Sequence, residues 1–405
     1  MILTLDRTWT RLGLRLQQAG AWVADRLGGW CWIVLLAGLP WALPNWLFFG
    51  GKQHLWEACA LWAQMGLLAT FGVAAWRGIQ TPRNLALAAY LLFAASNQLW
   101  MLIELKQQFG AVPDMVVQGA LHLTVLLLAW LSATTLWTPA FLPRLLKAVA
   151  ISGCLMMSYS VAQWMGFDPL FSGRDLPEGQ ELFHGMLGNS SHYGAYLALL
   201  APCLWLQRGR VWRGWSLLNA LLLWPASSTA AVVSYLGAGL VWAWRRSPRL
   251  GLALSMAAVL VLGIGSQTSW ANFSGRQQAW AAYWPHFTEG RPWRGMSLGY
   301  VWLRSRQAQQ EERTLKVWRY THSEPYQLAI EQGVVGLGFL GLMVLAWTRR
   351  AARIWRTPVG GTLTAIMVAF LLNSLVNFPA HLWALGSFGF VAYAGVYVLS
   401  RESTT

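Results

Sequence analysis

The chain has 405 residues, of which 56% are hydrophobic and only 11% are charged. A soluble domain carries roughly a quarter charged residues, so these values exclude a soluble globular protein, and also a disordered, coiled-coil or collagen-like chain. The 30 basic and 15 acidic residues give a net charge of +15, which suits nucleic acid, an anionic membrane surface or an anionic substrate, and the positions of the charges decide between these partners.

Twelve apolar stretches come near the roughly 20 residues that a helix needs to cross a bilayer. They are continuously apolar rather than alternating, which predicts an all-α, polytopic integral membrane protein rather than a barrel. The seventh stretch is the shortest and is rich in Trp. The predicted spans are 29–49, 55–76, 84–103, 115–136, 145–165, 190–207, 211–225, 227–244, 249–266, 326–347, 360–378 and 381–399.

The basic residues orient these spans. With a cytoplasmic N-terminus, 19 of the 30 basic residues fall in cytoplasmic segments, three fall in short outer loops and eight fall in one long outer segment, 267–325. This is the positive-inside pattern, and it places both termini in the cytoplasm and requires no nucleic acid. We therefore expect a membrane domain of nine spans (1–266), an outer catalytic loop (267–325) and a membrane domain of three spans (326–405).

The first part of the outer loop, SGRQQAWAAYWPHF, predicts a helix with Ser274 as its N-cap. Arg276, Trp280 and Trp284 fall on one face of this helix. An arginine beside the N–H groups of a helix start can bind an anion. The alternative is that Arg276 reaches the membrane surface or stacks on Trp280.

Arg291 and Arg294 flank a Pro-Trp pair, and Gly295 and Gly299 follow closely. Glycines allow a backbone to approach a ligand, which favours a binding loop. The loop lacks the GxxxxGK[ST] pattern of a nucleotide P-loop. The next stretch, 301–318, is interpreted as a polar helix with a solvated face.

Residues 323–325, Ser-Glu-Pro, predict the start of a membrane-spanning helix at the outer surface. His322 precedes this start, where the helix dipole disfavours a protonated imidazole and leaves it able to accept a proton. Gln327 and Glu331 follow on one face, and an ionisable residue inside a membrane is a functional candidate. The alternative is a buried hydrogen bond between helices.

No cluster of His, Cys or acidic residues has metal-ligand spacing, and neither a GxSxG elbow nor an obvious pair of carboxylates is present. Arginines with one histidine suit a substrate whose leaving group is a phosphate or pyrophosphate. Such chemistry requires no metal and no cofactor, because guanidinium groups supply the positive charge.

Three segments carry a resemblance to a known family. Residues 275–299 contain GRQQAWAAYWPHF…PWRGMSLG, residues 322–336 are HSEPYQLAIEQGVVG, and residues 187–202 are LGNSSHYGAYLALLAP. They resemble the Arg-x3-Trp, His-x3-Tyr-x-Gln and Gly-x-Asn-x-Asn segments of the O-antigen ligase/polymerase superfamily of bacterial envelope glycosyltransferases. One departure is Ser228-Thr229, where many members of that family have a Ser-Arg pair.

The resemblance implies transfer of a glycan from undecaprenyl pyrophosphate to an acceptor hydroxyl on the periplasmic face of the inner membrane. It maps the family's essential residues onto His322, as general base, and Arg276. A second family arginine corresponds to Arg291 or Arg294. The remaining substrate-binding candidates are Trp280, Gln327, Glu331 and Asn189.

We therefore expect an inverting, metal-independent glycosyltransferase of the ligase type, with the sugar of a lipid A-core glycolipid as acceptor. The expected partners are the lipid-linked glycan donor, this acceptor or a protein acceptor, and the bilayer. The alternatives are a polysaccharide polymerase and a protein (pilin) O-oligosaccharyltransferase. A transporter or flippase of a lipid-linked sugar ranks third, because the outer basic charge gathers in one loop.

Overall fold

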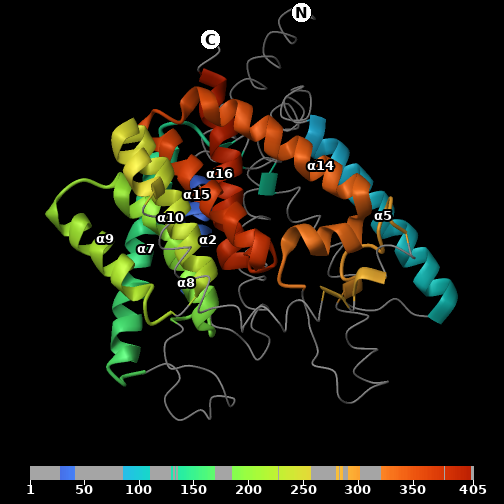
Figure 1. The fold of residues 1–405 in the computed structure, drawn as a ribbon. Coiled ribbons are helices and arrows are strands. Elements are labelled where there is room, and N and C mark those ends of the chain that lie inside the picture. Colours follow the sequence, from blue (N-terminus) through green and yellow to red (C-terminus); the bar gives the residue numbers. More distant parts are fainter. Residues whose placement is uncertain are drawn as a thin grey trace, which may run out of the picture.

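The computed structural model describes residues 28–41, 85–109, 129–130, 133, 136–168, 185–226, 228–256, 280–281, 283–285, 291–301, 321–377 and 379–402. No strand occurs in these ranges, so this part of the chain is all-helical, as the sequence predicts (Figure 1). The elements are α2 (Gly29–Gly38), η2 (Leu39–Trp41), α5 (Leu85–Phe109), α7 (Phe141–Trp164), α8 (Ser190–Leu206), α9 (Arg210–Leu222), α10 (Thr229–Arg246), α14 (Glu324–Ile354), α15 (Pro358–Val376), η6 (Pro379–His381) and α16 (Trp383–Glu402).

Four of these helices, α7, α14, α15 and α16, are long and apolar enough to cross a membrane. α9 differs from the predicted span 211–225, because it has only 13 residues. At 1.5 Å per residue it is about 20 Å long, shorter than the roughly 30 Å apolar core of a bilayer. Any crossing at this point therefore needs the residues on both sides of the helix as well.

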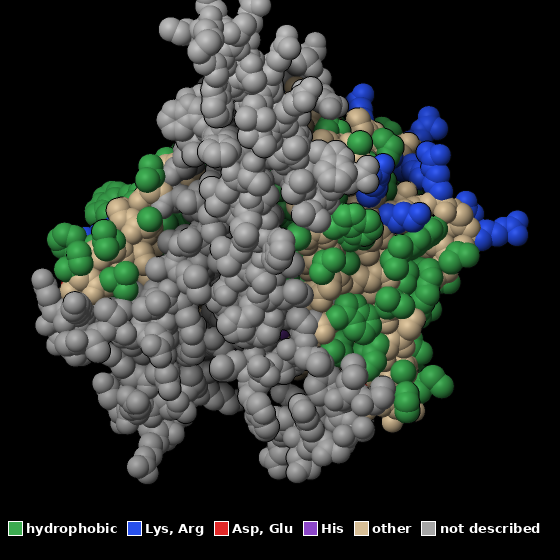
Figure 2. Space-filling view, turned by 180° about the vertical axis from the view of Figure 1, so that it is seen from behind, with side chains coloured by type: hydrophobic (Ala, Val, Ile, Leu, Met, Phe, Trp, Pro, Cys, Tyr) green, Lys and Arg blue, Asp and Glu red, His purple; other side chains and the backbone are tan. Residues whose placement is uncertain are grey.

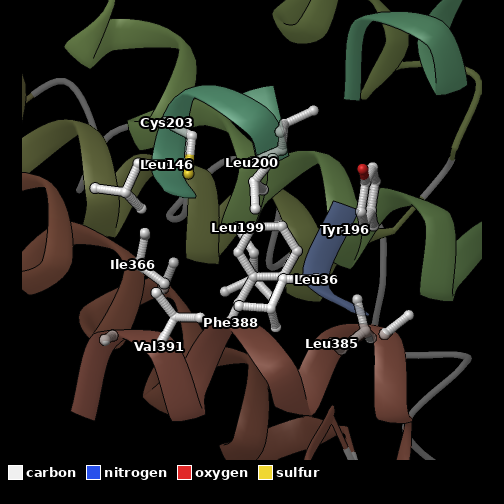
Figure 3. Packing of buried hydrophobic residues seen from close by; sticks show 14 of the residues in the cluster. Leu36, Leu146, Tyr196, Leu199, Leu200, Cys203, Ile366, Leu385, Phe388 and Val391 are labelled. Atoms are coloured by element: carbon white, nitrogen blue, oxygen red, sulfur yellow. The ribbon is translucent and has the colours of Figure 1, made fainter. Parts of the chain in front are cut away.

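α8 lies at the centre of the packed helices. Every residue from Tyr193 to Leu204 is buried, as expected for a helix that is apolar on all sides. Figure 3 shows Tyr196, Leu199 and Cys203 of α8 among side chains from α2, α7, α15 and α16. The hydrophobic core of the described region is thus built around one helix rather than against a sheet.

The described basic residues of the predicted cytoplasmic segments gather at one end of the helices. They lie at the start of α7, in the turn into α9, and at the ends of α10 and α14. In Figure 1 the start of α7 and the ends of α10 and α14 lie on the upper side, and the start of α14 lies lower. Figure 2 shows Lys and Arg side chains gathered along the upper right edge, above a broad hydrophobic surface.

Candidate functional site

The predicted continuous span 326–347 is interrupted. α14 is broken at Gly333, whose backbone (φ 65°, ψ −167°) is not helical, and the part before the break lies at a sharp angle to the part after it (Figure 1). The 291–301 loop takes up the backbone groups that the break releases, since buried N–H and C=O groups need partners. The four bonds run from Met296 N to Ile330 O (2.9 Å), Ser297 N to Glu331 O (2.7 Å), Val334 N to Pro292 O (2.8 Å) and Val335 N to Trp293 O (3.0 Å).

Two glycines allow this close approach. Gly295 and Gly333 both have positive φ, 71° and 65°. A Cβ atom on Gly295 would lie 2.4 Å from the Gln332 nitrogen, and one on Gly333 would lie 2.5 Å from the Trp293 carbonyl oxygen. The sequence predicts that Gly295 allows a ligand to approach the backbone. The structure instead places the α14 backbone against it, so this glycine holds the loop on the helix.

α5 holds the loop from its other side through two buried amides. Asn97 Nδ2 donates to the Arg294 carbonyl oxygen at 2.8 Å. Gln98 Oε1 accepts from the Leu298 N–H at 3.1 Å and from the Ser297 hydroxyl, and Gln98 Nε2 donates to the Leu298 carbonyl at 3.3 Å. Both amides are almost fully buried. Sequence reasoning missed them, although adjacent amides inside the predicted span 84–103 were the available signal.

Arg291 is tied to Glu104, another α5 residue that the sequence analysis did not select. Its guanidinium forms a two-pronged ion pair with the carboxylate, in which Nη1 lies 2.7 Å from Oε2 and Nη2 also bonds to Oε1. The hydrogen bond from Arg291 lowers the pKa of the Glu104 carboxyl, and Glu104 in turn raises the pKa of Arg291. Arg291 therefore fastens the loop to α5.

Arg294 lies in a different environment. Its guanidinium carbon lies 4.9 Å above the centre of the Trp100 ring on α5. Within the described ranges it forms no ion pair, unlike Arg291. An arginine stacked on an aromatic face keeps its N–H edge available for a planar anion. Of the two arginines that the sequence left as alternatives, Arg291 is paired with a carboxylate and Arg294 lies over an aromatic ring.

His322 occupies a tight turn just before α14, as predicted. The helix begins at Glu324 with Ser323 at the N-cap position and Pro325 in the first turn, although the Ser323 side chain makes no capping bond. His322 has a positive φ of 56°. The preceding residue, Thr321, is buried and held through its own hydroxyl, which donates to the Ser323 carbonyl at 2.9 Å. The turn thus presents a half-buried imidazole at the start of the helix.

Within the described ranges, left-handed backbone outside glycine occurs only at this site. Among the residues that the structure describes, Ser297 (φ 80°) and His322 (φ 56°) are the two non-glycine residues with positive φ. Each such conformation costs about 1–3 kcal/mol and persists only where its surroundings enforce it. One of the two lies in the 291–301 loop and the other in the turn before α14. The strain is therefore concentrated where the sequence predicts chemistry.

Gln327 and Glu331 share a face of α14, as predicted, but both lie inside the structure rather than on its surface, at 3% and 1% exposure. Gln327 Oε1 accepts from the Thr321 N–H at 3.2 Å, and its Nε2 donates to Glu331 Oε1 at 3.4 Å. The same carboxylate oxygen accepts from the N–H groups of Gly299 (3.1 Å) and Val301 (3.3 Å). These contacts connect the His322 turn with the 291–301 loop.

Three aromatic side chains adjoin the His322 turn. Trp280 Nε1 donates to the Thr321 carbonyl at 2.6 Å, and the Tyr326 hydroxyl donates to the Trp280 carbonyl. Trp284 stacks on Tyr326 with ring centres 6.1 Å apart and an interplanar angle of 19°. Trp280, predicted to bind substrate, is thereby placed beside His322.

Two other predicted site residues lie elsewhere. Asn189 caps the N-terminus of α8, where its side chain accepts from the N–H groups of Ser191 (2.9 Å) and His192 (3.2 Å). No contact within the described ranges links Asn189 to the 291–301 loop. Arg276 lies outside the residues that the structure describes.

A largely apolar cavity of about 250 Å³ opens between α5, α14, α15 and α16. Its wall includes Tyr90 of α5, Trp347 of α14 and Phe390 of α16. Near η6 the wall includes Ala380, whose N–H donates to Glu324 Oε1 at 2.6 Å. Ala380 therefore connects the cavity wall to Glu324, the first residue of α14.

The described site combines an imidazole, an arginine with an available edge, stacked aromatic rings and an apolar cavity. No protein-family model matches the chain, and no curated protein matches it either. A functional assignment therefore depends on the chemistry of these side chains. The side chains in question are the imidazole of His322, the guanidinium of Arg294 over Trp100, and the apolar residues of the cavity wall.

Proposed function

We propose that this protein is a membrane-embedded glycosyltransferase that uses a lipid-linked donor. The observation that carries the proposal is the hydrogen-bonded connection between the His322 turn and the loop that bears Arg294, beside an apolar cavity. Such a reaction requires a base, an anion-binding group and an apolar space that accepts part of the lipid chain of the donor. The resemblance of residues 275–299 and 322–336 to the O-antigen ligase/polymerase superfamily supports the same class.

Within that class, we propose a ligase of the O-antigen type. It transfers a glycan from undecaprenyl pyrophosphate to a hydroxyl of a lipid A-core sugar. In the predicted topology of twelve spans with both termini in the cytoplasm, the site faces the periplasm. Basic residues lie at the start of α7 and at the ends of α10 and α14, on the side away from the start of α14. This distribution supports the proposed orientation.

In the proposed reaction, the neutral imidazole of His322 takes the proton of the acceptor hydroxyl as its oxygen attacks the anomeric carbon. The bond between that carbon and the pyrophosphate oxygen breaks, and its electron pair stays on the pyrophosphate. Attack from the face opposite the leaving group inverts the anomeric configuration. Undecaprenyl pyrophosphate is released, and the proton on His322 passes to solvent.

Arg276 and Arg294 neutralise the negative charge that develops on the leaving pyrophosphate. Arg294 is the better partner than Arg291 because Arg291 is already paired with Glu104, whereas Arg294 lies over the Trp100 ring. The apolar cavity accepts part of the polyprenyl tail, since its wall is made almost entirely of apolar side chains. Trp280 and Asn189 stay candidates for substrate contact.

The test is glycan transfer in proteoliposomes that contain purified protein and lipid-linked glycan, with lipid A-core glycolipid as acceptor. We expect transfer by the wild type, none by the His322→Ala variant, and wild-type activity from His54→Ala, a matched control in a predicted short outer loop. Wild-type activity in His322→Ala would overturn the proposal.

The acceptor distinguishes the related activities in the same assay. Transfer to lipid A-core supports the ligase. Extension of the lipid-linked glycan without an added acceptor indicates a polymerase, and transfer to pilin indicates a protein O-oligosaccharyltransferase. Movement of the lipid-linked glycan across the bilayer without a new glycosidic bond indicates a transporter.

A further inference from the structure

The carboxylate of Glu331 is the best-connected charged group in the described site, yet it is only 1% exposed. A buried charge is costly unless hydrogen bonds satisfy it. Here Oε1 receives the N–H groups of Gly299 and Val301 and the Gln327 amide. The first two belong to the end of the 291–301 loop, so the carboxylate is bonded to the backbone of that loop.

The backbone of Glu331 takes part in the same junction. Its carbonyl oxygen, released by the break at Gly333, accepts from the Ser297 N–H at 2.7 Å. Ser297 is one of the two described non-glycine residues with positive φ. Glu331 therefore holds the 291–301 loop at two points, near Ser297 through its carbonyl and near Tyr300 through its carboxylate.

Gln327 connects Glu331 to the turn that contains His322, the second residue with a strained backbone. The Gln327 side chain has a donor end and an acceptor end. Its donor end points to Glu331 Oε1 (3.4 Å), so its acceptor end faces the Thr321 N–H (3.2 Å). Thr321 directly precedes His322, whose positive φ needs enforcement from its surroundings.

We propose that Glu331 is a positioning residue that fixes both halves of the site: through Gln327 it holds the His322 turn, and directly it holds the loop that carries Arg294. This inference rests on the proposed function for its catalytic meaning and replaces the substrate-binding role predicted for Glu331. A carboxylate enclosed by the chain's own N–H groups acts on substrate through the groups that it orients.

Amide hydrogen exchange on the purified protein tests the positioning without any need for activity. We expect Glu331→Ala to speed exchange in peptides that cover 299–301 and 321–323, and Gln327→Ala to speed it at 321–323 only. Asn373→Ala is the matched control, because Asn373 is also a fully buried amide but bonds to Ser234 of α10. Unchanged exchange at 321–323 in Glu331→Ala would overturn the inference.

Transferase kinetics test the catalytic consequence. A displacement of about 1 Å at a catalytic group costs about 100-fold in rate, so we expect kcat to fall by about that factor in Glu331→Ala. Because Gln327→Ala breaks the same connection to His322, the double variant should be little worse than Glu331→Ala alone. A raised donor KM with unchanged kcat would instead identify Glu331 as a substrate ligand.

The two proposals fail in different ways. A wild type that transfers no glycan while Glu331→Ala still speeds exchange at 321–323 refutes the glycosyltransferase and leaves the positioning role supported. A wild type that transfers glycan while Glu331→Ala keeps full kcat refutes the positioning role alone.

Discussion

The two arginines of the 291–301 loop are three residues apart and chemically identical, yet they contact different kinds of side chain. Arg291 is paired with Glu104, and Arg294 stacks on Trp100. We expect Arg294→Ala to raise the donor KM at least tenfold, and Arg294→Lys to restore little, because an ammonium group lacks the planar fork. Steady-state kinetics with lipid-linked donor measure this.

Arg291 supplies the comparison within the same loop. Arg291→Ala leaves Glu104 without its partner and should lower the melting temperature, whereas the double variant Arg291→Ala/Glu104→Ala should recover part of that loss. A donor KM that rises more in Arg291→Ala/Glu104→Ala than in Arg294→Ala would reverse the assignment of the two arginines.

The pKa of Glu104 gives a pH-dependent prediction. Arg291 lowers this pKa in the folded protein, relative to about 4.3 for an unperturbed Glu. The pair therefore stabilises the fold fully above pH about 4.3, and the stabilisation is lost as pH falls through the lower folded pKa. We expect wild type and Glu104→Gln to differ in melting temperature by a constant amount from pH 8 to 5. For a partly exposed pair the underlying stabilisation is about 1 kcal/mol. The difference in melting temperature should shrink below pH 4. A difference that grows as the pH falls would contradict the assignment of the ion pair.

Among the elements, α14 allows a direct test of its break, because Gly333 lies at the break and Gly338 lies in the regular helix after it. Gly333→Ala must place a Cβ 2.5 Å from the Trp293 carbonyl in a backbone conformation with φ 65°. We expect this variant to lose the docked loop, the transferase activity and several degrees of melting temperature. Thermal unfolding in detergent and the transfer assay measure both effects.

Gly338→Ala is the control in the same helix. A Cβ atom at Gly338 meets nothing within 4 Å, and alanine favours a helix by up to about 1 kcal/mol over glycine. This variant should keep full activity and melt at the same temperature or higher. Equal losses in the two variants would mean that the break at Gly333 has no special role.

The start of α14 and the face that carries Gln327 and Glu331 could be predicted from the sequence, and the break at Gly333 could not. Ser-Glu-Pro at 323–325 gives local signals for a helix start, and the spacing of Gln327 and Glu331 places them on one face. Gly333 lies among several glycines in an apolar run, where helix packing accounts for each of them equally well. The break depends on a loop some 40 residues away that supplies its backbone bonds, and a local pattern holds no information about such a partner. The partners of Asn97, Gln98 and Glu104 on α5 lie 187 to 200 residues away in the sequence, so a local pattern could flag the two amides but not identify what these side chains bind.

At the scale of the whole molecule, α9 decides the topology. The basic start of α7 and the basic ends of α10 and α14 lie on one side in Figure 1. The positive-inside pattern assigns this side to the cytoplasm and predicts that the chain returns across the membrane between α8 and α10. α9 has 13 residues, about 20 Å in length, so the turns on both sides of it must complete the crossing. Arg208 before α9 is exposed, and Trp224 after it is 88% exposed.

Single cysteines at these two positions test the crossing, in a chain whose four native cysteines are replaced by alanine. We expect a membrane-impermeant maleimide to label Trp224→Cys on intact spheroplasts, and to label Arg208→Cys only after the membrane is opened. Trp293→Cys, in the 291–301 loop, and Arg356→Cys, after α14, are the outer and inner references. If the cysteines at 208 and 224 are both labelled from the same side, α9 lies on one membrane surface. α10 then crosses the membrane in the direction opposite to the predicted one. The basic end of α10 would then lie outside, against the positive-inside pattern from which the twelve spans follow.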